Sequence, residues 1–499
     1  MKRFFLSMRS LAILATIAML LLLLPLILTS FYNRPVRDDL VQPYPAAVAY
    51  RKSGSVIQAF IASAKETIQL WNARTGIFSS MLISIFAPYI FNYTYGFIHP
   101  IFLTIFLIFS VYQAVRCLHL INKNIPTSYL WLITTVLSIM LLTTMPSAYE
   151  GYYWYSGAMN YTFFFILSLL LFSSLIKSIC TTTQTLKRKI ISLCLYCIAF
   201  FAIGGANWMT PTYSIVIYGM LIIWAIFKNK PKIYLLPFLF LLIGYLLAII
   251  APGNAYRQAF IGERLSLVDA FLTSFQHAIN FCTQNWQYYL ISLLLLPVFF
   301  HLKRFIPRLP RYLLLMPLCS ICILAAAYFP LVYSTYTIFY RHRNIIFFVF
   351  TVLLVINEAI FVFWIAEFIP KLLPKKDTCF FPAVVAAVVA VTFGMLSYYR
   401  TSISISPFDV SCNYPPAIAT IHLVQGYSKN YAGSYDHLVE KLQTTEDDVV
   451  IVDTFMRSPL LGMPDLQLDP ASWINEGFVK FHTDKEILLA QPRDLHLQQ

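Results

Sequence analysis

Charged residues are scarce in this chain. Asp, Glu, Lys and Arg make up 12% of its 499 residues, whereas hydrophobic residues make up 59%, and the mean hydropathy is +0.69. Soluble globular proteins carry about 25% charged residues, so the composition excludes an ordinary soluble protein. It indicates a multi-spanning membrane protein, because helices satisfy their own backbone hydrogen bonds in lipid.

The sequence also lacks the short motifs of several large enzyme classes. It contains no Walker loop, no dinucleotide-binding fingerprint and no HExxH motif, which argues against ATP-driven transport and against a zinc protease. Its nine cysteines have no metal-binding spacing, and we interpret them as small membrane hydrophobes.

Acidic residues are fewer than basic ones, with 22 Asp and Glu against 36 Lys and Arg. The net charge of +14 does not indicate a nucleic-acid partner, because the basic residues cluster in short loops between apolar segments. Cytoplasmic loops of membrane proteins carry such an excess. Lys2, Arg3 and Arg9 precede the first apolar segment, so we expect a cytoplasmic N-terminus. That segment has no small-residue cleavage site and is predicted to be a retained anchor.

Eleven spans satisfy this rule and leave the C-terminus outside the cytoplasm. The segment Gly76–Phe91 is short, and counting it as a span would turn the basic loops outward, so we predict a re-entrant or surface helix there. The predicted spans are residues 11–29, 95–117, 128–145, 160–179, 190–207, 212–228, 232–250, 286–302, 311–329, 344–369 and 380–398.

The composition changes at about Arg400. Of the 22 acidic residues, 13 lie from Asp409 onward, and the apolar spans stop. The run from Asp447 to Asp453 predicts one buried strand flanked by acids. We therefore expect a membrane domain of residues 1–399 and a small α/β extracytoplasmic domain of residues 400–499.

Asp38 and Asp39 stand side by side directly after the first span, in a region of 408 residues with only nine acids. Neighbouring carboxylates repel each other unless a cation or a shared proton is near. Ionisable groups near the bilayer are costly and often functional. A solvated acidic loop is the alternative, and the doublet alone favours neither interpretation.

Polar and aromatic residues gather in the predicted outer loops. The segment from Glu150 to Tyr161 contains five aromatic residues, one of which is Trp154. It also contains Asn160. Aromatic surfaces with a few polar groups suit sugar rings, although an interfacial aromatic belt would also explain the rings. Two turns rich in Gly and Pro add further candidates, which are Asn207, Asn254 and Arg257; for Asn207 a helix cap is the simpler interpretation.

Arg341, His342 and Arg343 lie at the predicted outer start of a span, against the positive-inside tendency. An anionic ligand such as a lipid phosphate would explain them, because Arg binds phosphate through two parallel hydrogen bonds. Snorkelling to lipid headgroups is the alternative.

Several motifs follow one another along the chain: Asp38-Asp39, Trp71-Asn-Ala-Arg74, Trp154-Tyr-Ser-Gly-Ala-Met-Asn-Tyr161, Gly205-Ala-Asn207, Pro252-Gly-Asn-Ala-Tyr-Arg257 and Asp469-Pro-Ala-Ser-Trp473-Ile-Asn475. Taken in order, these motifs resemble membrane glycosyltransferases of the GT-C superfamily, and within it a bacterial group, the DUF6056-like proteins. Two positions depart from the pattern of that group: Ala73 stands where Gly is usual, and Trp208 stands where Glu usually follows the asparagine.

The resemblance implies an α-helical polytopic protein of the bacterial inner membrane that transfers a sugar from a polyprenyl-phosphate donor to a cell-envelope acceptor, with inversion. It implies that Asp38 or Asp39 is the general base, and it leaves open a divalent metal at the acidic pair. The residues expected to bind the substrates are Arg74, Glu150, Trp154, Asn160, Asn207, Asn254, Arg257, Arg341, His342 and Arg343, with cations stabilising the departing phosphate.

Two other functions remain open. A flippase or transporter of lipid-linked glycans would need charged residues deep in several spans, and Glu358 is the one clear buried acid in the sequence. A non-catalytic membrane scaffold would use the C-terminal domain for binding.

Overall fold

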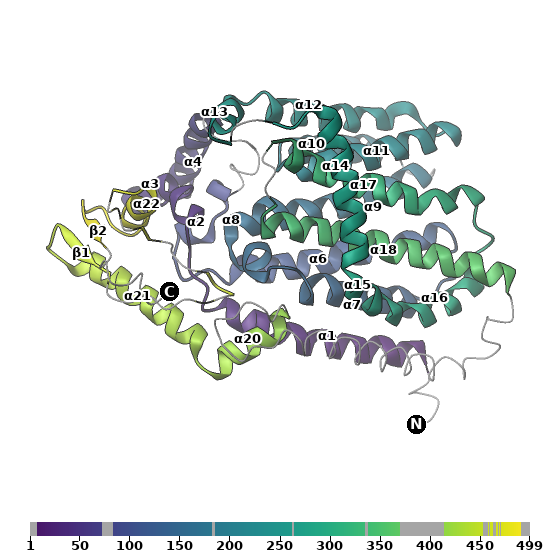
Figure 1. Cartoon of the computed structure of the whole chain (residues 1–499), viewed down its shortest axis with the longest axis horizontal. Helices are drawn as coiled ribbons and strands as arrows, with labels where there is room; N and C mark the ends of the chain where they lie inside the picture. The colour runs from purple at the N-terminus through teal and green to yellow at the C-terminus, as the bar shows by residue number, and fades with distance from the viewer. Residues whose placement is uncertain are drawn as a thin grey trace.

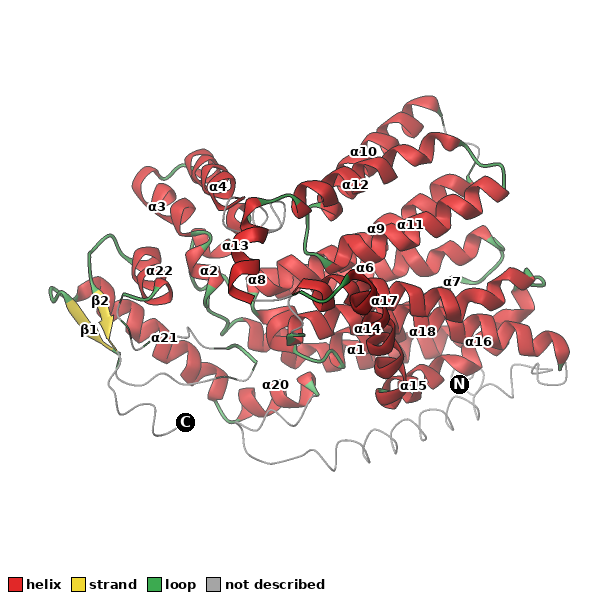
Figure 2. Ribbon diagram, turned by 45° about the horizontal axis from the view of Figure 1, so that its top comes forward, coloured by secondary structure: helices red, strands yellow, loops and turns green. Residues whose placement is uncertain are grey.

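A computed structural model describes residues 7–71, 83–181, 185–261, 264–334, 338–369, 414–452, 458, 460–462, 466–467, 469 and 471–490. Long helices lie roughly side by side and form a bundle, and shorter helices and one small sheet gather at one end of it (Figure 1). Figure 2 shows the same arrangement, with both strands at the end of the bundle that also carries α2, α3 and α4.

Long apolar runs produce the bundle. Among the described residues, seven helical segments are long and apolar enough to cross a membrane by length and composition. This is the architecture of a polytopic helical membrane protein. The bundle helices are α1 (Met8–Ser30), α6 (Ile98–Arg116), α7 (Thr127–Thr143), α9 (Phe163–Cys180), α10 (Leu186–Gly204), α11 (Met209–Phe227), α12 (Leu235–Ile249), α15 (Trp286–Ser292), α16 (Leu296–Leu302), α17 (Met316–Ser334) and α18 (Tyr340–Phe368).

Helices occupy every predicted span except residues 380–398, which lie outside the described residues. Helices α7 and α12 are apolar but shorter than the seven long segments. Residues 76–82 of the predicted re-entrant segment Gly76–Phe91 are likewise outside the described residues, and its described part contains a 3₁₀ turn, η1 (Pro88–Ile90). Further 3₁₀ turns flank the bundle helices: η2 (Cys117–Leu120), η5 (Lys232–Tyr234), η6 (Leu293–Leu295), η7 (Lys303–Phe305) and η8 (Arg311–Leu315).

Several helices that are not spans occupy the loops. Helix α14 (Leu267–Gln284) packs against the bundle through a narrow buried face of small residues, which are Ala270, Ser274 and Ala278. Small side chains at this spacing allow close packing of helices. This helix was not predicted from the sequence. The remaining short helices are α2 (Asp38–Val41), α3 (Tyr44–Ser53), α4 (Val56–Trp71) and α13 (Pro252–Ile261).

The C-terminal part consists of α20 (Pro415–Val424), α21 (Tyr427–Thr444), β1 (Val449–Ile451), α22 (Trp473–His482) and β2 (Leu488–Ala490). The two strands pair in parallel, with Val450 opposite Leu489. The strand predicted from Asp447 to Asp453 is shorter than expected, and only its central residue is buried, because the sheet that the described residues form has two strands and one open face. The hydrophobic core of this part is continuous with the core of the bundle.

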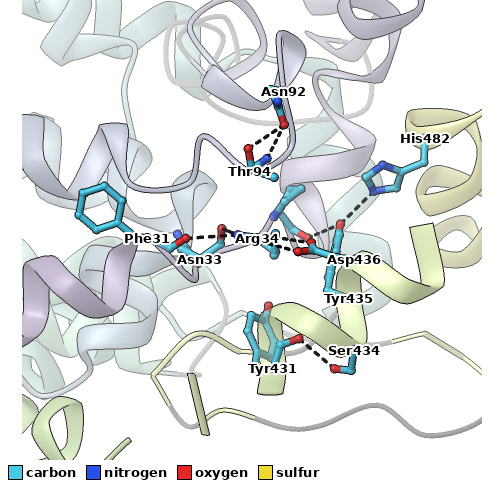
Figure 3. A network of polar contacts seen from close by, with 11 residues as sticks. Phe31, Asn33, Arg34, Asn92, Thr94, Tyr431, Ser434, Tyr435, Asp436 and His482 are labelled. Atoms are coloured by element: carbon cyan, nitrogen blue, oxygen red, sulfur yellow. Dashed lines mark hydrogen bonds and ion pairs between the residues drawn. The ribbon is translucent and has the colours of Figure 1, made fainter. Parts of the chain in front are cut away.

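The C-terminal part docks on the loop that follows α1. Arg34 forms a two-pronged ion pair with Asp436 on α21, with nitrogen–oxygen distances of 2.7 and 2.8 Å (Figure 3). The Tyr435 hydroxyl donates to the Pro35 carbonyl and lies 3.0 Å from His482 Nε2 on α22. Burial lowers the pKa of His482 to about 3, so this imidazole is neutral. The contacts hold the loop against α21 and α22.

Breaking the Arg34–Asp436 pair should loosen this docking. Arg34→Met and Asp436→Ala should each lower stability by about 1–2 kcal/mol, less than for a fully buried pair because Asp436 is 38% exposed. The double variant should cost less than the sum, since both changes remove the same contact. Thermal unfolding in detergent measures the effect. The exposed pair Glu476–Lys480 is the control, and Glu476→Ala should change stability by less than about 0.5 kcal/mol. Equal effects at both pairs would contradict the docking role.

Candidate active site

The aromatic segment predicted as a sugar platform folds into an unusual local structure. Two π-helical turns, η3 (Tyr149–Tyr153) and η4 (Ala158–Thr162), flank a single α-turn, α8 (Tyr155–Gly157). Such turns are rare and frequently occur at functional sites. Gly151 is required here, because a Cβ atom at this position would collide with the Asn344 amide. The two π-helical turns direct the backbone N–H groups of α8 toward the loop after α1.

Asp39 receives these N–H groups. Its Oδ1 accepts hydrogen bonds from the backbone N–H and the hydroxyl of Ser156, at 2.7 and 2.5 Å. Its Oδ2 accepts from the backbone N–H groups of Tyr155 and Val36, at 3.3 and 3.5 Å. The residue is completely buried. Asp39 therefore joins the loop to α8, and its carboxylate has no open side for a substrate in this conformation.

Asp38 differs from its neighbour in exposure. It opens α2, and it is half-buried where Asp39 is fully buried. The residue before it, Arg37, has φ +50° and ψ −120°. A non-glycine residue at positive φ is strained, and such strain clusters at functional sites. The buried anchor on one side and the constrained Arg37 on the other fix the position of the Asp38 backbone.

Burial also changes the acidity of Asp39. Loss of water raises the pKa of Asp39 to about 7, against the opposing effect of the hydrogen bonds from Ser156 and Val36. The nearby negative charge of Asp38 raises it further. The two carboxyl groups thus have different environments, with one held in the protein and one at its surface.

Glu150 contacts the start of α18. Its Oε2 accepts a hydrogen bond of 2.5 Å from the backbone N–H of Arg341, and the Arg341 guanidinium lies 4.0 Å away. The same guanidinium lies over the rings of Trp154 and Phe339, at 5.7 and 4.4 Å from their centroids. The indole N–H of Trp154 is buried and has no hydrogen-bond partner among the described residues. Aromatic rings and charged groups are thus in contact here, and the Trp154 indole N–H can donate a hydrogen bond to a ligand.

The three basic residues of α18 do not act as one cluster. Successive residues of a helix point about 100° apart, and here each side chain meets different partners. Arg341 faces Glu150, His342 Nε2 lies 3.3 Å from the Tyr161 hydroxyl, and Arg343 lies over the ring of Tyr340. A single phosphate bound by all three is incompatible with this geometry.

The asparagines predicted as ligand contacts have structural partners. Asn207 caps α11, since its Oδ1 accepts from the backbone N–H groups of Met209 and Thr210, and its amide donates to the Asn160 carbonyl. Asn254 donates to the last carbonyls of α12. The side-chain oxygen of Asn160 is buried, and no described residue donates to it.

For two of the predicted site residues the structure does not describe the side chain. Arg74 lies outside the described residues, and of Arg257 the structure describes the backbone, which is part of α13.

Other residues of the site were missed in the sequence. Asn33 is buried, and its amide donates to the carbonyls of Tyr153 and Gly96. Asn344 exchanges two hydrogen bonds with the backbone of Ser147. Both residues fix the π-helical segment to its neighbours. Asn33 stands within five residues of the doublet, but a lone asparagine gives no signal of which backbone it will meet.

Within the described part of the chain, no group of three His, Cys, Asp or Glu side chains could hold a metal ion. The oxygens of Asp39 are occupied by four protein donors, and this arrangement does not favour Asp39 as a ligand of a metal at the acidic pair.

Fold and site together define a polytopic helical protein with a polar, aromatic site at one end of its bundle. Comparison of the chain with protein families, with curated proteins and with solved structures found no match in any of the three.

Proposed function

We propose that the protein is an inverting membrane glycosyltransferase that uses a polyprenyl-phosphate-linked sugar as donor and a hydroxyl of a cell-envelope glycan, lipid or protein as acceptor. One observation carries the proposal: Asp38 presents a half-buried carboxyl group beside a fully buried, four-fold hydrogen-bonded Asp39, directly after the strained Arg37. A solvated loop with no task needs neither the anchor nor the strain.

The proposed roles follow from exposure. Asp38 is the general base that takes the proton of the acceptor hydroxyl, and Asp39 is a positioning residue. The acceptor oxygen forms a bond to the anomeric carbon while the bond from that carbon to the phosphate oxygen breaks. The electron pair leaves with the polyprenyl phosphate. Moving the proton in the transition state typically contributes about 10²–10⁴-fold in rate.

The surroundings of Asp38 support a sugar ligand. The open donor on Trp154 and the open acceptor on Asn160 lie in one segment, on either side of α8, which anchors Asp39. Sugar hydroxyls both donate and accept, so they can satisfy such groups, and ring faces stack on aromatics. Arg341 is already paired with Glu150 and Arg343 lines a separate pocket, which leaves Arg257 as the better candidate to stabilise the departing phosphate.

The direct test is transfer by purified protein in lipid nanodiscs, with radiolabelled polyprenyl-phosphate sugars and a membrane extract as the acceptor source. Label appearing in an acceptor, with release of polyprenyl phosphate, supports the proposal. In a parallel assay with the protein in proteoliposomes, movement of labelled lipid between leaflets without any transfer would favour a flippase instead.

The proposed reaction also requires one orientation of the protein in the membrane, with the Asp38 site on the outer face. In the bacterial inner membrane we expect a cytoplasmic N-terminus and an extracytoplasmic C-terminus, because basic loops face inward. Alkaline phosphatase fused after Gln499 should be active and a green fluorescent protein fusion at the same position should be dark. A fusion to the loop at Lys187 should give the opposite result. The reverse pattern would place the Asp38 site on the wrong face and contradict the proposal.

A further inference from the structure

A pocket lies at the junction of α14, α15, α17 and α18, next to the segment that follows α7. Its volume is about 530 Å³, and its walls carry the side-chain amides of Asn280, Gln284, Asn285 and Gln287. Ligand pockets typically measure roughly 300–1,000 Å³. Arg343 is the one residue of this pocket that was predicted from the sequence as a binding residue, because α14 was not predicted.

Gln287 carries the strongest evidence that the pocket binds a ligand. The residue is 7% exposed. Its Nε2 donates to Asn285 Oδ1 at 3.3 Å, whereas its Oε1 is buried without a partner among the described residues. Buried polar atoms are nearly always hydrogen-bonded, so an exception requires an explanation. A ligand that donates an O–H or N–H group would supply the missing bond.

The charges and rings of the pocket restrict the chemistry of that ligand. No acid lines the pocket, and Arg343 has no acidic partner in the part of the chain that the structure describes. Its guanidinium lies 5.3 Å from the centroid of the Tyr340 ring. His277 stacks on Tyr328, and burial lowers the pKa of this imidazole, so it is largely neutral at pH 7. The pocket therefore offers amides, tyrosine rings and one permanent positive charge.

From these observations we infer that the pocket binds a sugar ring that carries one phosphate ester. Side-chain amides match sugar hydroxyls, because each can both donate and accept. Tyrosine rings cover the apolar face of the sugar, and one arginine matches one phosphate through paired hydrogen bonds. The ligand is either a free sugar phosphate or the headgroup of a phosphate-linked glycolipid. Binding of a free sugar phosphate does not depend on the proposed function, because the ligand binds without being converted. Only the assignment of a glycolipid headgroup rests on the proposed function.

Binding of three probes to the protein in nanodiscs tests the inference: methyl glucoside, glucose 1-phosphate and polyprenyl-phosphate glucose, followed by equilibrium dialysis or by saturation-transfer NMR. Gln287→Leu should weaken all three by about tenfold or more, since a hydroxyl loses its acceptor. Arg343→Gln should weaken the two phosphate esters by a similar factor and leave methyl glucoside unchanged.

The controls separate binding from folding. Gln276 is exposed on α14 and does not line the pocket, so Gln276→Leu should leave all affinities unchanged. The melting temperature of Gln287→Leu should equal or exceed that of the wild type, because the substitution removes an unpaired buried carbonyl. If Gln287→Leu does not fold, Arg343→Gln at the exposed arginine still tests the phosphate contact.

Each result has a defined meaning. Tight binding of glucose 1-phosphate assigns a free sugar phosphate, and binding of the glycolipid alone assigns a lipid headgroup. Absence of binding by all three probes, or unchanged affinities in both variants, overturns the inference. Probe binding that survives in a protein without transfer activity would contradict the proposed function while leaving the pocket assigned.

Discussion

Asp38→Asn is expected to lower the rate of sugar transfer by at least about 100-fold and to leave the thermal stability of the protein unchanged. The substitution keeps the size of the side chain but removes the basic oxygen, and a general base typically contributes about 10²–10⁴-fold. Because Asp38 is half-buried and opens the short helix α2, its stability effect should stay within about ±0.5 kcal/mol. Transfer rates at matched protein level measure the first effect, and melting curves in detergent measure the second.

Asp269 provides a matched control for Asp38. It also lies in the first turn of a helix, α14, and its carboxylate accepts a hydrogen bond from the exposed Ser266 side chain. Asp269→Asn should transfer sugar at the wild-type rate. If Asp38→Asn does the same, the half-buried carboxylate has no catalytic task and the proposed mechanism is wrong.

Asp39→Asn is expected to destabilise the protein strongly. An amide can offer its oxygen to Ser156, but its NH₂ group then faces the backbone N–H groups of Tyr155 and Val36. Each buried donor left without an acceptor costs about 1–3 kcal/mol. The resulting loss should appear as a lower melting temperature and as faster proteolysis of the loop after α1. A variant with wild-type stability would show that the four hydrogen bonds do not hold the loop in place.

The same residue should make stability depend on pH. The pKa of Asp39 is raised from its ordinary value of 3.8 to about 7 in the folded protein by burial. Between these two values the folded state binds the proton and the unfolded state does not, so stability falls as pH rises from about 4 to 7. The stability advantage of the wild type over Asp39→Asn should therefore shrink across this range. A constant difference in melting temperature would contradict the raised pKa.

Local sequence was sufficient to predict the class of the protein. The length and hydropathy of a span are properties of about 20 consecutive residues, and helices occupy all the predicted spans within the described residues. The doublet after α1 was also recognisable, because acids are rare in the first 408 residues. Helix α14 was missed because polar residues such as Asp269, Gln276 and Asn280 interrupt its apolar ones, a pattern that lacks the hydropathy of a span.

The site itself depended on contacts between distant parts of the chain. The sequence does not distinguish the environments of Asp38 and Asp39. Packing against Ser156, 117 residues beyond Asp39, buries the Asp39 carboxylate and leaves Asp38 half-buried. Likewise Arg34 meets its acid 402 positions away. Three adjacent basic residues on α18 resemble one binding cluster in the sequence, but the helical turn sends them to Glu150, Tyr161 and a separate pocket. Tertiary packing determines such pairings because it brings together side chains whose separation along the chain carries no information about their distance in space.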